Sequence, residues 1–179
     1  MSAQKNKKCK NSRQGTLIKE LQLEPTELVI LKISRYYFLN FVDPIKQNWL
    51  NAINEALDKF GHKKGPEIAV TVLAAIQTMR RSRISPFCFN SPECECCSIF
   101  ITDNERNFLN IIRSVSEGNI KKANTYGFVL CESNESEMLI KSIQILTKIC
   151  DSNWRFFIKG HTLFLNYRKA ESFHVTSLS

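Results

Sequence analysis

The segment DPIKQNWLNAINEALDKFG, residues 43–61, carries the clearest secondary-structure signal in the chain. Its apolar side chains recur at spacings of three and four residues, as they do on one buried face of an α-helix. Asp43 followed by Pro44 is typical of a helix start, and Gly61 is typical of a helix end. We therefore predict a helix over residues 44–60 whose buried face contains Ile45, Trp49, Ala52, Ile53, Ala56, Leu57 and Phe60.

Five further helices are expected around this segment. The helix that follows Gly65-Pro66 has an apolar, alanine-rich middle, which is typical of the central helix of a bundle. Thr102 and Glu105 have the spacing of a capping box, which predicts a helix start at Thr102. The expected fold is mainly α: a single bundle of about six helices. The other five cover about residues 26–42, 66–81, 102–118, 120–131 and 135–150.

Both ends of the chain differ from this helical part. Residues 1–19 contain six Lys and Arg and no Asp or Glu, so of the net charge of +8 only +2 remains for the rest of the chain. Residues 1–20 are therefore expected to be a basic disordered tail, residues 21–170 a helical, zinc-stabilised domain, and residues 171–179 a frayed C-terminus. Two short aromatic runs on either side of Gly160 are compatible with a short C-terminal β-hairpin, and equally with an extended segment packed on the helices.

The composition indicates a protein with a real core and no membrane span. Hydrophobic residues make up 43% of the chain, which is close to the globular norm. The longest strongly apolar run covers residues 68–76, and a spanning helix needs roughly 20 residues. The basic N-terminus has no apolar segment behind it, unlike a secretory signal. We expect a cytoplasmic location.

Four of the seven cysteines lie between residues 88 and 97. Cys94 and Cys97 form a C-x2-C pair, a spacing that can present two thiolates to one tetrahedral zinc ion. A closed structural zinc site needs four ligands, so we look for two more thiols. The preferred set is Cys88, Cys94, Cys97 and Cys131, with Cys96 as a substitute for Cys88. In this set Cys131 joins a distant helix to the loop.

Two other interpretations of the cysteines stay open. Cys131 and Cys150 are also explained as small buried apolar residues. The cysteines between residues 88 and 97 are then thiols that bind no metal. Alternatively, Cys94 and Cys97 form the redox pair of a thiol-based sensor or oxidoreductase. The expected pattern of helices lacks the βαβ context of a thioredoxin-like site, so a structural zinc site is favoured.

The remaining motifs favour a binding module over an enzyme. The chain has no phosphate-binding loop, nucleophile elbow or zinc-protease motif, and no small-molecule substrate is evident. We expect a non-catalytic, zinc-stabilised binding or regulatory module whose partner is a nucleic acid or a protein. Basic residues that could contact phosphates are Lys7, Lys8, Arg80, Arg81 and Arg83. The arginines are equally explained as cations at a helix C-terminus.

Overall fold

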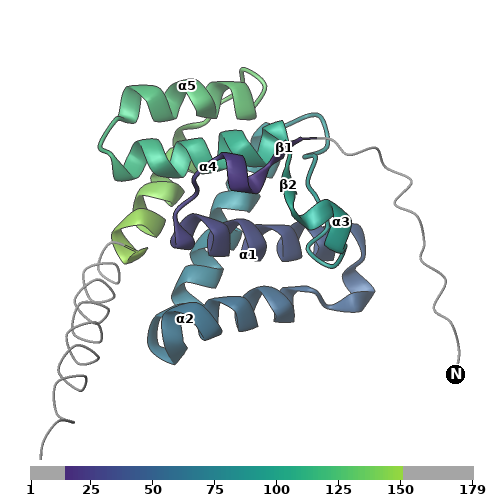
Figure 1. Ribbon diagram of the computed structural model, residues 1–179. Helices are drawn as coiled ribbons and strands as arrows, with labels where there is room; N and C mark the ends of the chain where they lie inside the picture. Colours follow the sequence, from purple (N-terminus) through teal and green to yellow (C-terminus); the bar gives the residue numbers. More distant parts are fainter. Residues whose placement is uncertain (1–14, 151–179) are drawn as a thin grey trace, which may run out of the picture.

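In the computed structural model, which describes residues 15–150, helices surround one apolar core, and a two-stranded ladder lies at one edge (Figure 1). The mainly helical fold is as predicted. The elements in chain order are β1 (Thr16–Leu17), the 3₁₀ turn η1 (Ile18–Glu20), α1 (Pro25–Val42), the 3₁₀ turn η2 (Pro44–Lys46), α2 (Trp49–Ser82), α3 (Glu95–Ser98), β2 (Phe100–Ile101), α4 (Asp103–Ser116), α5 (Ile120–Leu130) and a last helix over residues 137–150.

Helix α1 supplies a large part of the core because it is apolar around most of its circumference. Ile33 is fully buried and Phe38 is 4% exposed. The Tyr37 hydroxyl donates a hydrogen bond of 3.0 Å to the carbonyl of Ala69, which joins α1 to α2. Burial raises the pKa of Tyr37 to about 12, so the phenol stays protonated as this hydrogen bond requires.

Helix α2 combines the two helices expected over residues 44–60 and 66–81. Its two arms meet at Gly61, whose φ of 75° and ψ of 168° lie outside the helical region, and they run in different directions in Figure 1. Gly65 is buried in the second arm, where an added Cβ would lie 2.8 Å from the carbonyl oxygen of Ala56 in the first arm. The lack of a side chain at Gly65 therefore lets the two arms approach closely.

The predicted start of the helix over residues 44–60 is wrong. Pro44–Lys46 is a 3₁₀ turn, and Gln47 then has a left-handed conformation (φ 50°, ψ 39°), so α2 begins only at Trp49. This break removes Ile45 from the phase of the helix, and its side chain is 92% exposed. Trp49 is 41% exposed, whereas Ala52, later on the predicted face, is fully buried.

The predicted capping box at the start of α4 is confirmed. The Glu105 amide donates to Thr102 Oγ1 at 3.1 Å, and the Thr102 amide donates to Glu105 Oε2 at 2.8 Å. Phe108 and Ile111, about one and two helical turns further on, are buried in the core. The capping box therefore begins α4 at the end of the cysteine-rich loop and brings Glu105 into the interior.

Residues 15–20 belong to the folded part, which corrects the predicted tail over residues 1–20. Strands β1 and β2 are antiparallel, with Thr16 opposite Ile101 and Leu17 opposite Phe100. The amide of Ile18 also donates to the carbonyl of Ile99 at 2.9 Å. This pairing joins segments more than 80 residues apart, which local sequence patterns do not reveal.

Several predictions lie outside the described residues: Lys7 and Lys8 in the basic tail, the C-terminal hairpin, and the frayed end after residue 170. Within residues 15–150, no helix combines the length and the apolar character needed to cross a membrane.

Candidate metal centre

Three cysteines come together on one short helical turn. The Sγ atoms of Cys94, Cys96 and Cys97 all lie within 4.8 Å of one another. Cys94 is the residue just before α3, and its carbonyl accepts hydrogen bonds from the amides of Cys97 at 3.0 Å and Ser98 at 2.8 Å. These two bonds close the turn, so the local backbone alone brings the thiols together.

The spacing of the sulfur atoms fits a thiolate-bound metal ion. Cys96 Sγ lies 3.2 Å from Cys94 Sγ and 3.9 Å from Cys97 Sγ. With metal–sulfur bonds of 2.3 Å, two ligands of a tetrahedral zinc ion are about 3.8 Å apart. The longer contact already has this length, and the shorter one needs a movement of roughly half an ångström. Three thiols in this arrangement can hold a soft metal ion.

Only part of the predicted ligand set meets at this turn. Cys94 and Cys97 lie together as their spacing predicts, and the substitute Cys96 joins them. Cys88 is exposed and does not belong to the group of thiols within 4.8 Å.

Cys131, the predicted distant ligand, is also outside this group. Its thiol is completely buried beside Ser82, at the end of α5. Burial raises the pKa of the Cys131 thiol, which opposes the thiolate form that metal binding requires. The position agrees with the alternative interpretation of Cys131 as a small buried apolar residue.

A buried arginine, which the sequence analysis did not identify, anchors the cysteine turn to the core. The Arg35 guanidinium donates to the carbonyls of Ser98 at 2.7 Å and Phe100 at 2.5 Å, on either side of the end of α3. It also forms an ion pair with Glu105, with Nε 2.7 Å from Oε1. Both side chains are almost fully buried, at 5% and 2% exposure. The charge of Arg35 among the apolar residues of α1 was the available signal.

The segment before the turn is held by the same carboxylate and by aromatic packing. The Asn90 amide donates to Glu105 Oε1 at 3.2 Å, and its side chain donates to the carbonyl of Phe100 at 2.9 Å. The rings of Phe87 and Phe89 pack on Phe38, with centroid distances of 4.2 Å and 5.4 Å. The loop that contains the thiols is therefore ordered by contacts within the protein.

The three arginines after α2's apolar part do not form one exposed basic cluster. Arg83 is only 7% exposed in its side chain; it lies 3.1 Å from Glu132 and donates to the carbonyl of Leu130. Arg80 lies 3.9 Å above the ring of Phe41. Arg80 and Arg81 remain exposed to solvent. Arg83, one of the three predicted phosphate-contacting arginines in the described residues, therefore has a structural role.

Glu132, which follows α5, joins it to the segment after α2, and the stability of this contact depends on pH. Its carboxylate accepts from the Ser85 hydroxyl, from the Ser85 amide at 3.1 Å and from the Ile84 amide at 2.8 Å. These bonds, with a smaller contribution from Arg83, lower its pKa from 4.5 to about 2. Since the folded pKa lies below the unfolded one, the stabilisation is complete above about pH 4.5 and is lost as the pH falls toward 2.

We expect the difference in unfolding free energy between the wild type and Glu132→Gln to be constant from neutral pH to about pH 5. It should then shrink steadily as the pH falls toward 2, because the wild-type carboxylate becomes protonated. Urea denaturation at a series of pH values measures this difference. A difference that does not change with pH would show that the carboxylate charge has no role here.

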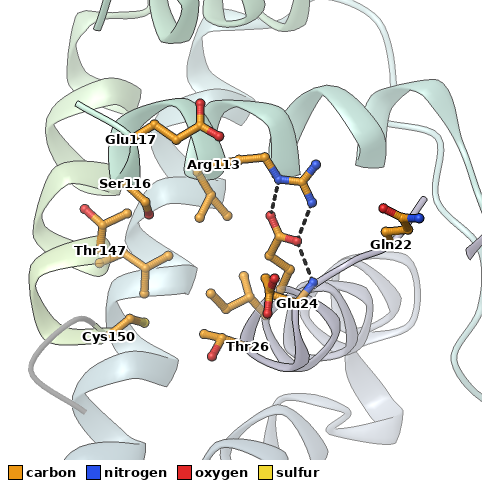
Figure 2. A pocket seen from close by; sticks show the side chains of 12 residues that line it. Gln22, Glu24, Thr26, Arg113, Ser116, Glu117, Thr147 and Cys150 are labelled. Carbon is orange, nitrogen blue, oxygen red and sulfur yellow. Dashed lines mark hydrogen bonds and ion pairs between the residues drawn. The ribbon is translucent and has the colours of Figure 1, made fainter. Parts of the chain in front are cut away.

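A separate cavity of about 440 Å³ lies between the start of α1, the end of α4 and the last helix (Figure 2). None of its lining residues belongs to the cysteine turn. Arg113 spans it as a bidentate ion pair with Glu27, with contacts of 2.9 Å and 2.6 Å. This pairing raises the pKa of Arg113. The pair joins α4 to α1 at the wall of the cavity, and its two charges neutralise each other.

Comparison of the chain with models of protein families, with curated proteins and with solved structures found no match. The chemistry of the described residues is therefore the basis for any statement about function. Its most specific feature is the group of three thiols at Cys94, Cys96 and Cys97.

Proposed function

We propose that this protein is a non-catalytic regulatory module that binds one zinc ion through Cys94, Cys96 and Cys97. The observation that supports the proposal is the approach of the three Sγ atoms to within 4.8 Å of one another on a surface turn. Thiolates bind soft and borderline metal ions, and zinc is one of these. Zinc has no redox chemistry, so its binding needs no electron donor or acceptor. The same ion was expected from the spacing of Cys94 and Cys97.

A regulatory role fits better than a role in which zinc is needed to form the whole fold. The turn is already attached to α1 and α4 through Arg35 and Glu105. Cys96 is exposed, so an ion can reach the thiols from solvent. Zinc binding would then change the surface of an ordered loop. Such a change regulates the binding of a partner to that surface.

A non-catalytic role is favoured by the state of Glu105, the buried carboxylate that supports the turn through Arg35. Glu105 accepts hydrogen bonds from the backbone amides of Asn90 and Thr102, and it forms an ion pair with Arg35. A carboxylate with all its lone pairs in use is a poor general base for a metal-bound water.

A protein partner is favoured over a nucleic acid. Arg83 is committed to Glu132 and the carbonyl of Leu130, which leaves Arg80 and Arg81 as exposed arginines at the end of α2. Beside the turn, Ile99 is 52% exposed, and Ile84 on the loop before it is 90% exposed. Exposed apolar side chains contribute more to protein contacts than to phosphate contacts.

Metal content tests the zinc site directly. The full-length protein, purified with zinc present, should contain one zinc ion per chain by native mass spectrometry. Serine at Cys94, Cys96 or Cys97 should weaken zinc binding by at least about 100-fold, because each substitution removes a ligand. Cys131→Ser is the matched control and should keep the metal, since its thiol is buried elsewhere. Unchanged zinc content in a variant that lacks all three loop thiols would contradict the proposal.

A redox role is the second candidate, and the 3.2 Å contact between Cys94 Sγ and Cys96 Sγ favours it. In that case the two thiols lose two protons and two electrons to an oxidant and form a disulfide. Diamide serves as the oxidant in the test, and mass spectrometry of the alkylated protein locates the bond. A metal-free protein that cycles between these two forms would replace the zinc proposal with this one.

A further inference from the structure

We infer that zinc binding at the cysteine turn is coupled to the docking of β1, so that the metal ion helps to hold residues 15–20 on the domain. The inference rests on the proposed zinc site and adds the conformational change that the ion controls. When a ligand at one site changes the stability of a second site, the second site changes the affinity for the ligand by the same factor. The structure provides a direct backbone connection between the two sites.

The cysteine turn leads directly into the strand on which β1 docks (Figure 1). Helix α3 ends at Ser98, and β2 begins at Phe100. The amide of Ile99, between them, donates to the carbonyl of Cys97, which is one of the three proposed ligands. The carbonyl of Ile99 accepts from the amide of Ile18, just after β1, at 2.9 Å. The two backbone groups of Ile99 therefore join a metal-binding residue to the docked segment.

The docking of β1 depends on a close backbone fit and on little buried surface. The strand has only two residues, and none of residues 15–20 is fully buried. Gly15 has a φ of 130°, and a Cβ added to it would lie 2.0 Å from the carbonyl oxygen of Ile101. Arg106 of α4 adds one hydrogen bond, of 3.3 Å, to Thr16 Oγ1. A two-stranded ladder of this kind is only marginally stable. A small change in the backbone at residues 99–101 is therefore enough to shift the docking equilibrium.

Zinc binding acts on the same stretch of backbone. The Sγ atoms of Cys94 and Cys96 lie 3.2 Å apart and must separate to about 3.8 Å around a tetrahedral ion. The Cys94 carbonyl accepts from the amides of Cys97 and Ser98, so a restraint at Cys94 reaches the end of the turn.

The coupling is expected to be positive, which means that each event favours the other. Three metal–sulfur bonds restrict the conformations of residues 94–97, so less conformational entropy is left to lose when Ile99 accepts the hydrogen bond from Ile18. In the metal-free protein β1 should open more often. A rise in zinc concentration would then be converted into tighter attachment of residues 15–20.

Hydrogen exchange of the Ile18 amide tests the coupling in the full-length wild-type protein, with and without one equivalent of zinc. Zinc should slow this exchange by at least about 5-fold, the lower end of the usual range for coupled sites. The control is the Lys122 amide, which donates to Asn119 Oδ1 at 3.0 Å at the exposed start of α5. It exchanges by local fraying and should change by less than about 2-fold. An unchanged rate at Ile18 with zinc bound, or equal slowing of both amides, overturns the inference.

The reverse effect is measured with Ile18→Pro, which removes the amide that donates to Ile99. Proline fits this position, because Ile18 is the first residue of η1 and Leu17 before it has a φ of −65° and a ψ of 131°. Ile18→Ala is the matched control, since it shortens the side chain but keeps the donor. Zinc affinity, measured by competition with a chromophoric chelator, should be about 5-fold weaker for Ile18→Pro than for Ile18→Ala. Circular dichroism checks that both variants keep their helices.

The failure of this inference is distinguishable from the failure of the proposed function. Equal zinc affinities for Ile18→Pro and Ile18→Ala overturn the coupling and leave the zinc site in place. If the wild-type protein binds no zinc in the same competition assay, the proposed function fails and the coupling fails with it.

Discussion

Replacing Arg35 with methionine is expected to lower the free energy of unfolding by about 3–5 kcal/mol, the usual cost of removing one partner from a buried ion pair. The substitution leaves the Glu105 carboxylate in the interior without its cation. It also removes the donors to the carbonyls of Ser98 and Phe100, which lie at the end of the cysteine turn and just after it. Urea denaturation followed by circular dichroism measures the loss.

The matched control is Lys32→Met, which removes the cation of a pair at the surface. Lys32 lies 2.5 Å from Glu55, but its side chain is 47% exposed. Solvent screens such a pair, so the expected loss is under about 1 kcal/mol. Equal losses for the two variants would mean that the burial of Arg35 has no energetic consequence.

Arg35 also links stability to the proposed metal site. Arg35→Lys keeps the charge but replaces the planar guanidinium, which donates to three groups at once, with a single ammonium. Because the two carbonyls lose part of their support, the turn should hold its thiols less well. We expect zinc affinity to fall by about 10-fold, the lower end of the range for residues that position metal ligands.

The second large effect is expected for Phe38→Ala, with a loss of about 3–5 kcal/mol in unfolding free energy. Phe38 is 4% exposed, and its ring stacks on Phe87 at 4.2 Å and contacts Phe89 at 5.4 Å. The substitution leaves a cavity beneath the cysteine-rich loop. Hydrogen exchange should therefore show faster opening of residues 87–90 than of α5, in addition to the lower stability seen in thermal or urea unfolding.

Phe128→Ala removes the same number of atoms at a site that is 55% exposed. It should cost under about 1 kcal/mol, because little apolar surface is returned to water and no cavity forms. A loss at Phe128 as large as that at Phe38 would contradict the assignment of Phe38 to the core and of Phe128 to the surface.

The predicted features that the structure bears out are those governed by local geometry. The capping box from Thr102 to Glu105 and the closeness of Cys94 to Cys97 depend on spacings of three residues, which one helical turn brings together. The end of a helical arm at Gly61 follows from the ability of glycine to adopt a positive φ without steric cost.

The errors occurred where a distant contact or a single backbone conformation outweighed the pattern. Gln47 takes a left-handed conformation that interrupts an otherwise regular apolar repeat and exposes Ile45. The need for a fourth ligand led to the choice of the distant Cys131, but its thiol is buried beside Ser82 and lies outside the group of thiols at the turn. Strand pairing drew residues 16–17 out of the expected tail.

The sequence by itself therefore determined most of the helices and the meeting of Cys94 with Cys97, because hydrophobic periodicity, caps and short spacings act within a few residues. Only the tertiary structure decided that Arg35 and Glu105, 70 residues apart, hold that turn in place. A charged residue within an apolar helix indicates that a partner must exist, since burying an unpaired charge is costly. Which partner it finds depends on how α1 and α4 pack, and no local pattern contains that information.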